Sequence, residues 1–235
     1  MDLKNKLIRV GVVGGMGPQT SFSFCLNLNN KFRKIMHTQP DIILENLPLS
    51  KKSEQELISG KSSPQHFQLM LHAIQRLHHA DVDFIVIPCN TVHIFIDELR
   101  KRSHKPILSI IEETALICRE KNLQTIGLLG TTKTITEALH QQALEKIGIT
   151  SLILPQKDQE HLNTIIINII NATSTTQDQQ ALLKMINTLQ KSGAQAIILA
   201  CTDLTHLIQS AQSPLPLIDT CSVLENATLK CLIEG

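Results

Sequence analysis

The chain has 235 residues, of which 42% are hydrophobic and 18% charged, a composition typical of a soluble globular protein with one large or two small domains. Its formal net charge of +1 and its lack of Trp and Tyr argue against a nucleic-acid-binding or membrane-binding surface. The apolar runs have strand length, and the first residues lack the pattern of a signal peptide, so we expect a cytoplasmic protein.

Apolar runs alternate with amphipathic segments along the chain, which predicts parallel α/β architecture. Strands are predicted at residues 9–13, 42–44, 84–87, 107–110, 125–129, 151–154, 196–199 and 217–218. Helices are predicted at residues 20–37, 63–79, 91–102, 111–121, 135–147, 158–171, 178–192, 203–211 and 221–232.

The order of these elements contains a duplication. "VGVVGGMGP" resembles "IGLLGTTKT", "ADVDFIVIPCNT" resembles "GAQAIILACTD", and "KPILSI" resembles "LPLIDT". The pairs Gly11 and Gly127 (127 − 11 = 116), Cys89 and Cys201 (201 − 89 = 112), and Pro106 and Pro216 (216 − 106 = 110) give nearly constant offsets. A repeat this long is a whole small domain rather than one unit of a solenoid.

We therefore predict two pseudo-symmetric α/β domains, each with a small parallel sheet flanked by helices. The first comprises residues 1–104 together with 216–235 and carries Cys89, and the second comprises residues 105–215 and carries Cys201. Ligands of such domains bind beyond the carboxyl ends of the strands, so we expect the active site in the interdomain cleft.

The duplicated cysteines lie where ligands of a parallel sheet bind. Cys89 and Cys201 each end a predicted strand and precede a predicted helix. Unpaired N–H groups at a helix N-terminus favour thiolate, so the pKa of at least one thiol is expected to fall below its usual value of about 8.5. The other four cysteines (Cys25, Cys118, Cys221 and Cys231) are interpreted as packing residues, and no Cys or His spacing indicates a metal site.

Two equivalent thiols on opposite sides of a cleft suit the inversion of a carbon centre. One cysteine as thiolate removes a proton from one face, and the other as thiol returns a proton to the opposite face. Charge then develops on the neighbouring carboxylate and requires fixed hydrogen-bond donors. The candidate substrate-binding residues are Met16, Gly17, Asn90, Thr91, Thr131, Thr132, Thr134, Thr202 and Lys52.

The motifs "GVVGGMGPQTS", "PCNTVH", "SIIEET" and "ACTDL" resemble the aspartate/glutamate racemase family over almost the whole chain. The resemblance implies a cofactor-independent amino-acid racemase, with aspartate or glutamate as substrate, Cys89 and Cys201 as catalytic residues, and a homodimer. The glycine-rich turn lacks the G-x-G-x-x-G spacing of a dinucleotide site, in agreement with the absence of a cofactor.

The chain departs from the family pattern where a second substrate carboxylate would bind. Aspartate racemases of this type carry Pro-Asp-Arg-Thr after the second strand, whereas this chain reads "LPLSKKSEQE", with Lys51 and Lys52 as the nearest cations. The second motif has Asp203 where the family has Glu.

Two alternatives follow: a catalytically silent protein that binds a small acid, or a superfamily isomerase or hydantoin racemase that uses the same cysteines. His93 and His206, four and five residues after the cysteines, are secondary candidates for proton transfer.

Overall fold

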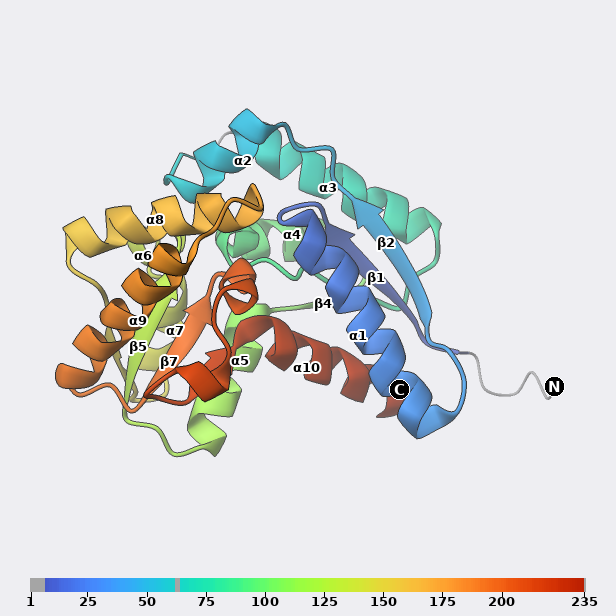
Figure 1. Ribbon diagram of the computed structural model, residues 1–235. Helices are drawn as coiled ribbons and strands as arrows, with labels where there is room; N and C mark the ends of the chain where they lie inside the picture. Colours follow the sequence, from blue (N-terminus) through green and yellow to red (C-terminus); the bar gives the residue numbers. More distant parts are fainter. Residues whose placement is uncertain (1–6, 62–63, 235) are drawn as a thin grey trace.

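A computed structural model describes residues 7–61 and 64–234 of the chain (Figure 1). Two four-stranded, fully parallel sheets form the centres of two domains, with strand orders β2-β1-β3-β4 and β6-β5-β7-β8. The two orders are equivalent position by position, so the predicted α/β duplication is confirmed. The strands are β1 (Arg9–Gly14), β2 (Asp41–Asn46), β3 (Phe84–Val86), β4 (Ile107–Leu108), β5 (Thr125–Gly130), β6 (Thr150–Leu152), β7 (Ala196–Ala200) and β8 (Leu217–Asp219).

Helices cover both faces of each sheet, which explains why the central strands are continuous apolar runs. The α-helices are α1 (Pro18–Met36), α2 (Lys51–Ile58), α3 (Pro64–His79), α4 (Ile96–Arg102), α5 (Ile110–Glu120), α6 (Thr132–Thr136), α7 (Leu139–Glu145), α8 (Gln156–Ile170), α9 (Thr176–Lys191) and α10 (Thr220–Glu234). Three 3₁₀ helices complete the described elements: η1 (Thr91–Phe95), η2 (Thr202–His206) and η3 (Ser210–Gln212). The predicted helix start at Ser63 lies outside the described residues.

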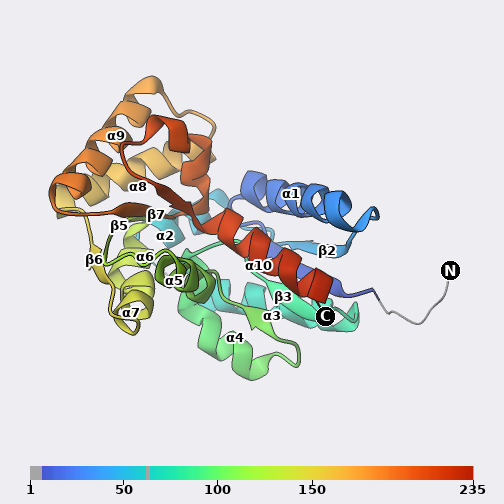
Figure 2. The same ribbon diagram turned by 90° about the horizontal axis from the view of Figure 1, so that it is seen from below.

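The strand pairing corrects the predicted domain boundaries. Strand β4 pairs with β3 in the first sheet, and β8 pairs with β7 in the second, so each final strand stays with its own sheet. The helices that follow them cross over instead. α10 packs in the core cluster of α1 and β1, while α5 extends from that cluster into the core of the second sheet. Figure 2 shows α10 running diagonally between the two halves toward α1.

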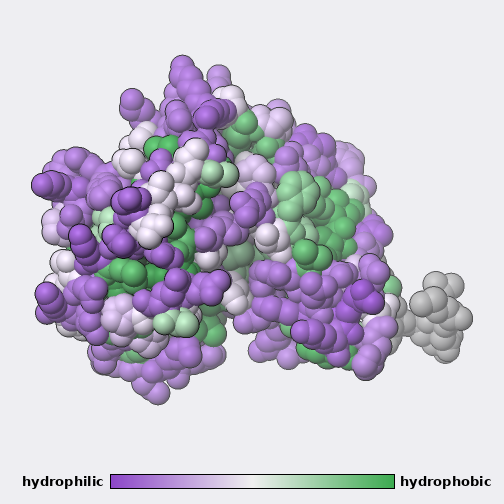
Figure 3. All heavy atoms as spheres, in the orientation of Figure 1, coloured by the Kyte–Doolittle hydropathy of each residue, from purple (hydrophilic) through white to green (hydrophobic). Residues whose placement is uncertain are grey.

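The two domains are joined by these exchanged helices and by one helix that was not predicted. Helix α2 follows β2 of the first domain yet contacts α6 and α8 of the second. It begins at Ser50, whose hydroxyl accepts a hydrogen bond from the Ser53 N–H, and its buried residues are Leu57 and Ile58. In Figure 3 the surface is indented between the two lobes. No helix of the described residues is long and apolar enough to cross a membrane.

Candidate active site

The two duplicated cysteines border one cavity between the domains. Cys89 follows β3 and precedes η1, and Cys201 follows β7 and precedes η2, so both lie at the carboxyl ends of their sheets. The cavity encloses about 430 Å³ of space, part of it open to solvent. It lies where the sequence predicted a ligand site.

Most of the predicted site residues line this cavity. They are Met16, Gly17, Cys89, Asn90, Thr91, Thr131, Cys201 and Thr202. Residues that were not predicted complete the wall: Leu49, Glu54, Leu57, Ile58, Ile166, Ile170 and Asp203. The apolar side chains of α2 and α8 come from different domains, so no local sequence pattern relates them.

Three predicted residues lie outside the cavity wall. Thr134 is buried behind it, where its hydroxyl contacts those of Thr91 at 3.2 Å and Thr131 at 3.0 Å. Thr132 hydrogen-bonds Asn163 through both its N–H and its hydroxyl. Lys52 is exposed at the start of α2, so the structure does not bring its ammonium to the cavity.

The environment of the thiols differs from the sequence expectation. Burial raises the pKa of Cys89 to about 11, against a weaker lowering by hydrogen bonds from the backbone at Val92 and Thr91. Burial and the nearby Asp203 carboxylate raise the pKa of Cys201 well above its usual value. The predicted fall in thiol pKa is therefore wrong, because desolvation outweighs the few available N–H donors.

Asp203 connects the second cysteine to the first turn of α1 in the first domain. Its Oδ2 accepts a long hydrogen bond from the Cys201 thiol at 3.8 Å, and its Oδ1 accepts one from the Thr20 hydroxyl at 2.6 Å. Burial raises the pKa of this carboxyl group. The exposed His206 lies 3.3 Å from the Thr20 hydroxyl, so it sits beyond Asp203 rather than beside the thiol.

Asn90 is held in place by groups from the second half of the chain. Its Nδ2 donates to the Thr220 hydroxyl at 2.9 Å, and its Oδ1 lies 2.9 Å from Nε2 of the buried His140. Because Oδ1 only accepts, Nε2 of His140 must carry the proton. The side-chain amide beside Cys89 is therefore fixed before any ligand enters.

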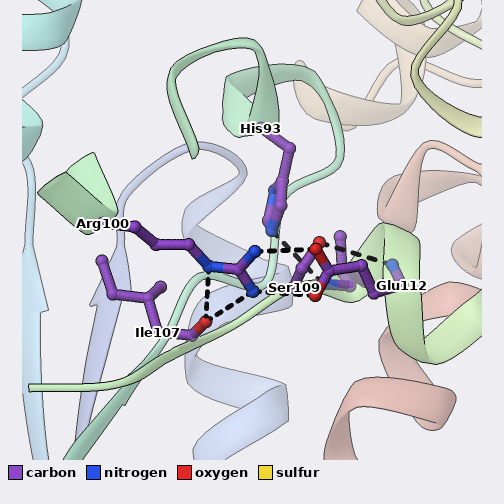
Figure 4. Close-up of polar contacts among 6 residues, drawn as sticks. His93, Arg100, Ile107, Ser109 and Glu112 are labelled. Atoms are coloured by element: carbon purple, nitrogen blue, oxygen red, sulfur yellow. Dashed lines mark hydrogen bonds and ion pairs between the residues drawn. The ribbon is translucent and has the colours of Figure 1, made fainter. Parts of the chain in front are cut away.

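His93 supports the cysteine loop instead of facing the cavity. Its Nδ1 donates to the Cys89 carbonyl at 2.8 Å, and its Nε2 accepts from the Ile110 N–H at 3.2 Å, which defines a neutral ring. Figure 4 shows the His93 ring beside the Arg100 guanidinium. The guanidinium binds both carboxylate oxygens of Glu112 and the Ile107 carbonyl. The site therefore gives His93 a positioning role and no direct contact with a substrate.

Two of the buried histidines, His93 and His140, predict a loss of stability in mild acid. Burial lowers the pKa of His93 to about 4 and that of His140 to about 3, whereas unfolded histidine titrates near 6.5. The unfolded chain therefore binds more protons below pH 6.5, and each histidine is expected to reduce the free energy of unfolding by about 2 kcal/mol from pH 7 to pH 5.

Urea unfolding at pH 7 and pH 5 measures this loss. His140→Gln keeps an N–H donor for Asn90. It is expected to make the loss of free energy of unfolding between pH 7 and pH 5, the pH-dependent decrement, smaller by about 2 kcal/mol. His72→Gln, on the exposed face of α3, is the matched control and is expected to leave the decrement unchanged. Equal decrements in wild type and His140→Gln would contradict the assignment of a buried neutral ring.

Comparison with known proteins decides the family. The Asp/Glu/Hydantoin racemase family model matches residues 13–228. The chain belongs to this family. It is 27% identical over 225 residues to the broad specificity amino-acid racemase RacX of Bacillus subtilis (strain 168), with 94% of this chain and 96% of that protein covered.

Solved structures of racemases share the fold over almost the whole length. A candidate Asp/Glu racemase from Yersinia pestis superposes with a TM-score of 0.83 and 26% identity, covering 96% of this chain and 99% of that one. The aspartate racemase of Picrophilus torridus gives a TM-score of 0.79 at 22% identity, covering 95% and 94%. The two-domain racemase architecture predicted from the sequence is therefore confirmed.

Proposed function

We propose that this member of the family is a cofactor-independent amino-acid racemase in which Cys89 and Cys201 are the two acid–base groups. The observation that carries the proposal is the placement of both thiols, from equivalent strand ends of two duplicated domains, on one cavity. An α-carbon held between them presents its two faces to different cysteines. Family membership supports racemisation as the reaction class.

In this mechanism the Cys89 thiolate takes the α-proton of one enantiomer, and the Cys201 thiol gives its proton to the opposite face. The reverse reaction uses Cys201 as base and Cys89 as acid. Charge that develops on the substrate carboxylate is stabilised by hydrogen-bond donors of the strand-end loops, for which Asn90, Thr91 and Thr202 are the nearest candidates.

The raised thiol pKa values have a consequence for this mechanism. A thiol that stays protonated is ready to act as the acid, whereas its partner must lose a proton before it acts as the base. The α-ammonium group of a bound amino acid places a positive charge near both sulfurs and favours that ionisation. Substrate binding thus offsets part of the desolvation that raises the pKa of the two thiols.

The test of the proposal is exchange of the α-proton with solvent deuterium over a panel of L- and D-amino acids, with substituted hydantoins as additional compounds. A racemase is expected to give deuterated product of inverted configuration for at least one member. Binding of an amino acid without any exchange would instead identify the chain as a binding protein, and exchange confined to hydantoins would identify a hydantoin racemase. The family resemblance favours aspartate or glutamate as the substrate. The charged residues that line the cavity favour a substrate side chain of a different kind.

A further inference from the structure

Two carboxylic side chains line the cavity, and the cations that act on them, Lys51 on Glu54 and His206 on Asp203, lie outside its wall. Glu54 and Asp203 line it, and among the described residues no Lys, Arg or His does so. The nearest basic groups are exposed: Lys51 borders a shallow depression on the outer side of Glu54, and His206 borders an opening near Gly17. A dicarboxylic amino acid would place its second carboxylate beside like charge, which is unfavourable at close range.

One wall of the cavity is aliphatic and is built by both domains. Leu57 and Ile58 of α2 face the cavity from the first domain, and Ile166 and Ile170 of α8 face it from the second. Ile166 and Ile170 are one helical turn apart and so present a continuous surface. This wall suits the methylene groups of an extended substrate side chain.

Glu54 lies at the outer end of that wall. It lines the cavity together with Ile58 and Ile170, and the same three residues line the shallow outer depression between α2 and α8. Its carboxylate is half-buried, and within the described residues no Lys or Arg lies within ion-pair distance of it, although the charge of Lys51 opposes the rise in its pKa. A side chain that starts between the cysteines and follows the aliphatic wall would reach Glu54.

From this juxtaposition we propose that the side-chain subsite selects basic amino acids, whose aliphatic stem packs on Leu57, Ile58, Ile166 and Ile170 and whose terminal cation pairs with Glu54. The inference rests on the proposed racemase function and names its substrate class. Burial and the Asp203 charge raise the pKa of Glu54. A cation in the cavity would oppose that shift and stabilise the carboxylate, as expected for a residue whose partner is the ligand.

The experiment measures kcat/KM for α-deuterium exchange with L-lysine, L-ornithine, L-norleucine, L-glutamate and L-aspartate. The proposal predicts that kcat/KM for lysine or ornithine exceeds that for either acidic amino acid at least about tenfold. Norleucine has the same aliphatic chain without the cation. Glu54→Gln is therefore expected to lower the lysine-to-norleucine ratio of kcat/KM at least about tenfold, since it removes the ion pair and retains the volume.

Glu56→Gln is the matched control, because Glu56 lies on the same helix and does not line the cavity. It is expected to leave the lysine-to-norleucine ratio at the wild-type value. A preference for glutamate or aspartate, or an unchanged ratio in Glu54→Gln, would overturn the basic side-chain subsite while leaving the racemase function intact. Absence of exchange with every panel member would overturn the racemase function and the subsite with it.

Discussion

Replacing Cys89 or Cys201 with alanine is expected to reduce racemisation at least about 1,000-fold in both directions, because each direction requires one sulfur as base and the other as acid. Chiral chromatography of product formed from each enantiomer measures the loss. Both residues follow buried strands and leave only a small space when truncated. The variants are therefore expected to fold, and circular dichroism with thermal unfolding checks this.

Cys25→Ala and Cys231→Ala are the matched controls. Both cysteines are half-buried free thiols on α1 and α10, and neither lines the cavity. They are expected to keep wild-type activity, so a general effect of losing a thiol is separated from a catalytic one. Wild-type racemisation by a folded Cys89→Ala or Cys201→Ala variant would refute the two-thiol mechanism.

Gly17→Ala is expected to lower kcat/KM at least about 100-fold. Gly17 has a φ of 92°, and an added Cβ would lie 2.7 Å from Oδ1 and 3.0 Å from Oδ2 of Asp203. Asp203 would have to move away from the Thr20 hydroxyl and the Cys201 thiol, and a displacement of about 1 Å in a site can cost about 100-fold. Steady-state kinetics with the best panel substrate measures the effect.

Gly193→Ala separates backbone strain from this local clash. Its φ of 100° is similar, but an added Cβ would meet nothing within 4 Å. Each alanine is expected to cost about 1 kcal/mol of stability through its positive φ, whereas only Gly17→Ala is expected to impair catalysis. Equal activity of the two variants would show that the position of Asp203 does not matter for turnover.

The duplication explains why so much of the fold could be predicted. Equivalent motifs around Gly11 and Gly127, and around Cys89 and Cys201, recur in the same order, and the two sheets have equivalent strand orders. The carboxyl ends of parallel strands meet at one edge, so the rule that ligands bind there was sufficient to bring both cysteines to one cavity. Family motifs then indicated the reaction class.

The parts that were not predicted depend on packing between segments distant in sequence. The boundaries predicted from Pro106 and Pro216 assigned each edge strand to the same domain as the helix that follows it, whereas β4 and β8 pair within their own sheets and only the helices cross over. No helix was predicted at α2. Its start, "SKKSEQ", is polar, and its apolar pair Leu57 and Ile58 packs in the cores of different domains.

The electrostatics of the site also could not be predicted from the sequence. A helix N-terminus lowers a thiol pKa only where its N–H groups outweigh desolvation, and the short 3₁₀ helices after both cysteines provide few such donors. Glu54 had no recognisable signal, because its proposed role depends on a cavity whose wall comes from two domains and whose lining, within the described residues, includes no Lys or Arg. Composition and periodicity carry no information about that cavity.

The central claim is that the two sulfurs act on opposite faces of one α-carbon, and an early-time isotope experiment in deuterium oxide tests it most directly. Each enantiomer of the best panel substrate is incubated separately, and α-deuterium is measured by NMR in both the product and the remaining substrate. The two-thiol mechanism predicts deuterium in the inverted product while the remaining substrate keeps its α-protium. Product that retains α-protium, or substrate that acquires deuterium as fast as product forms, would contradict it.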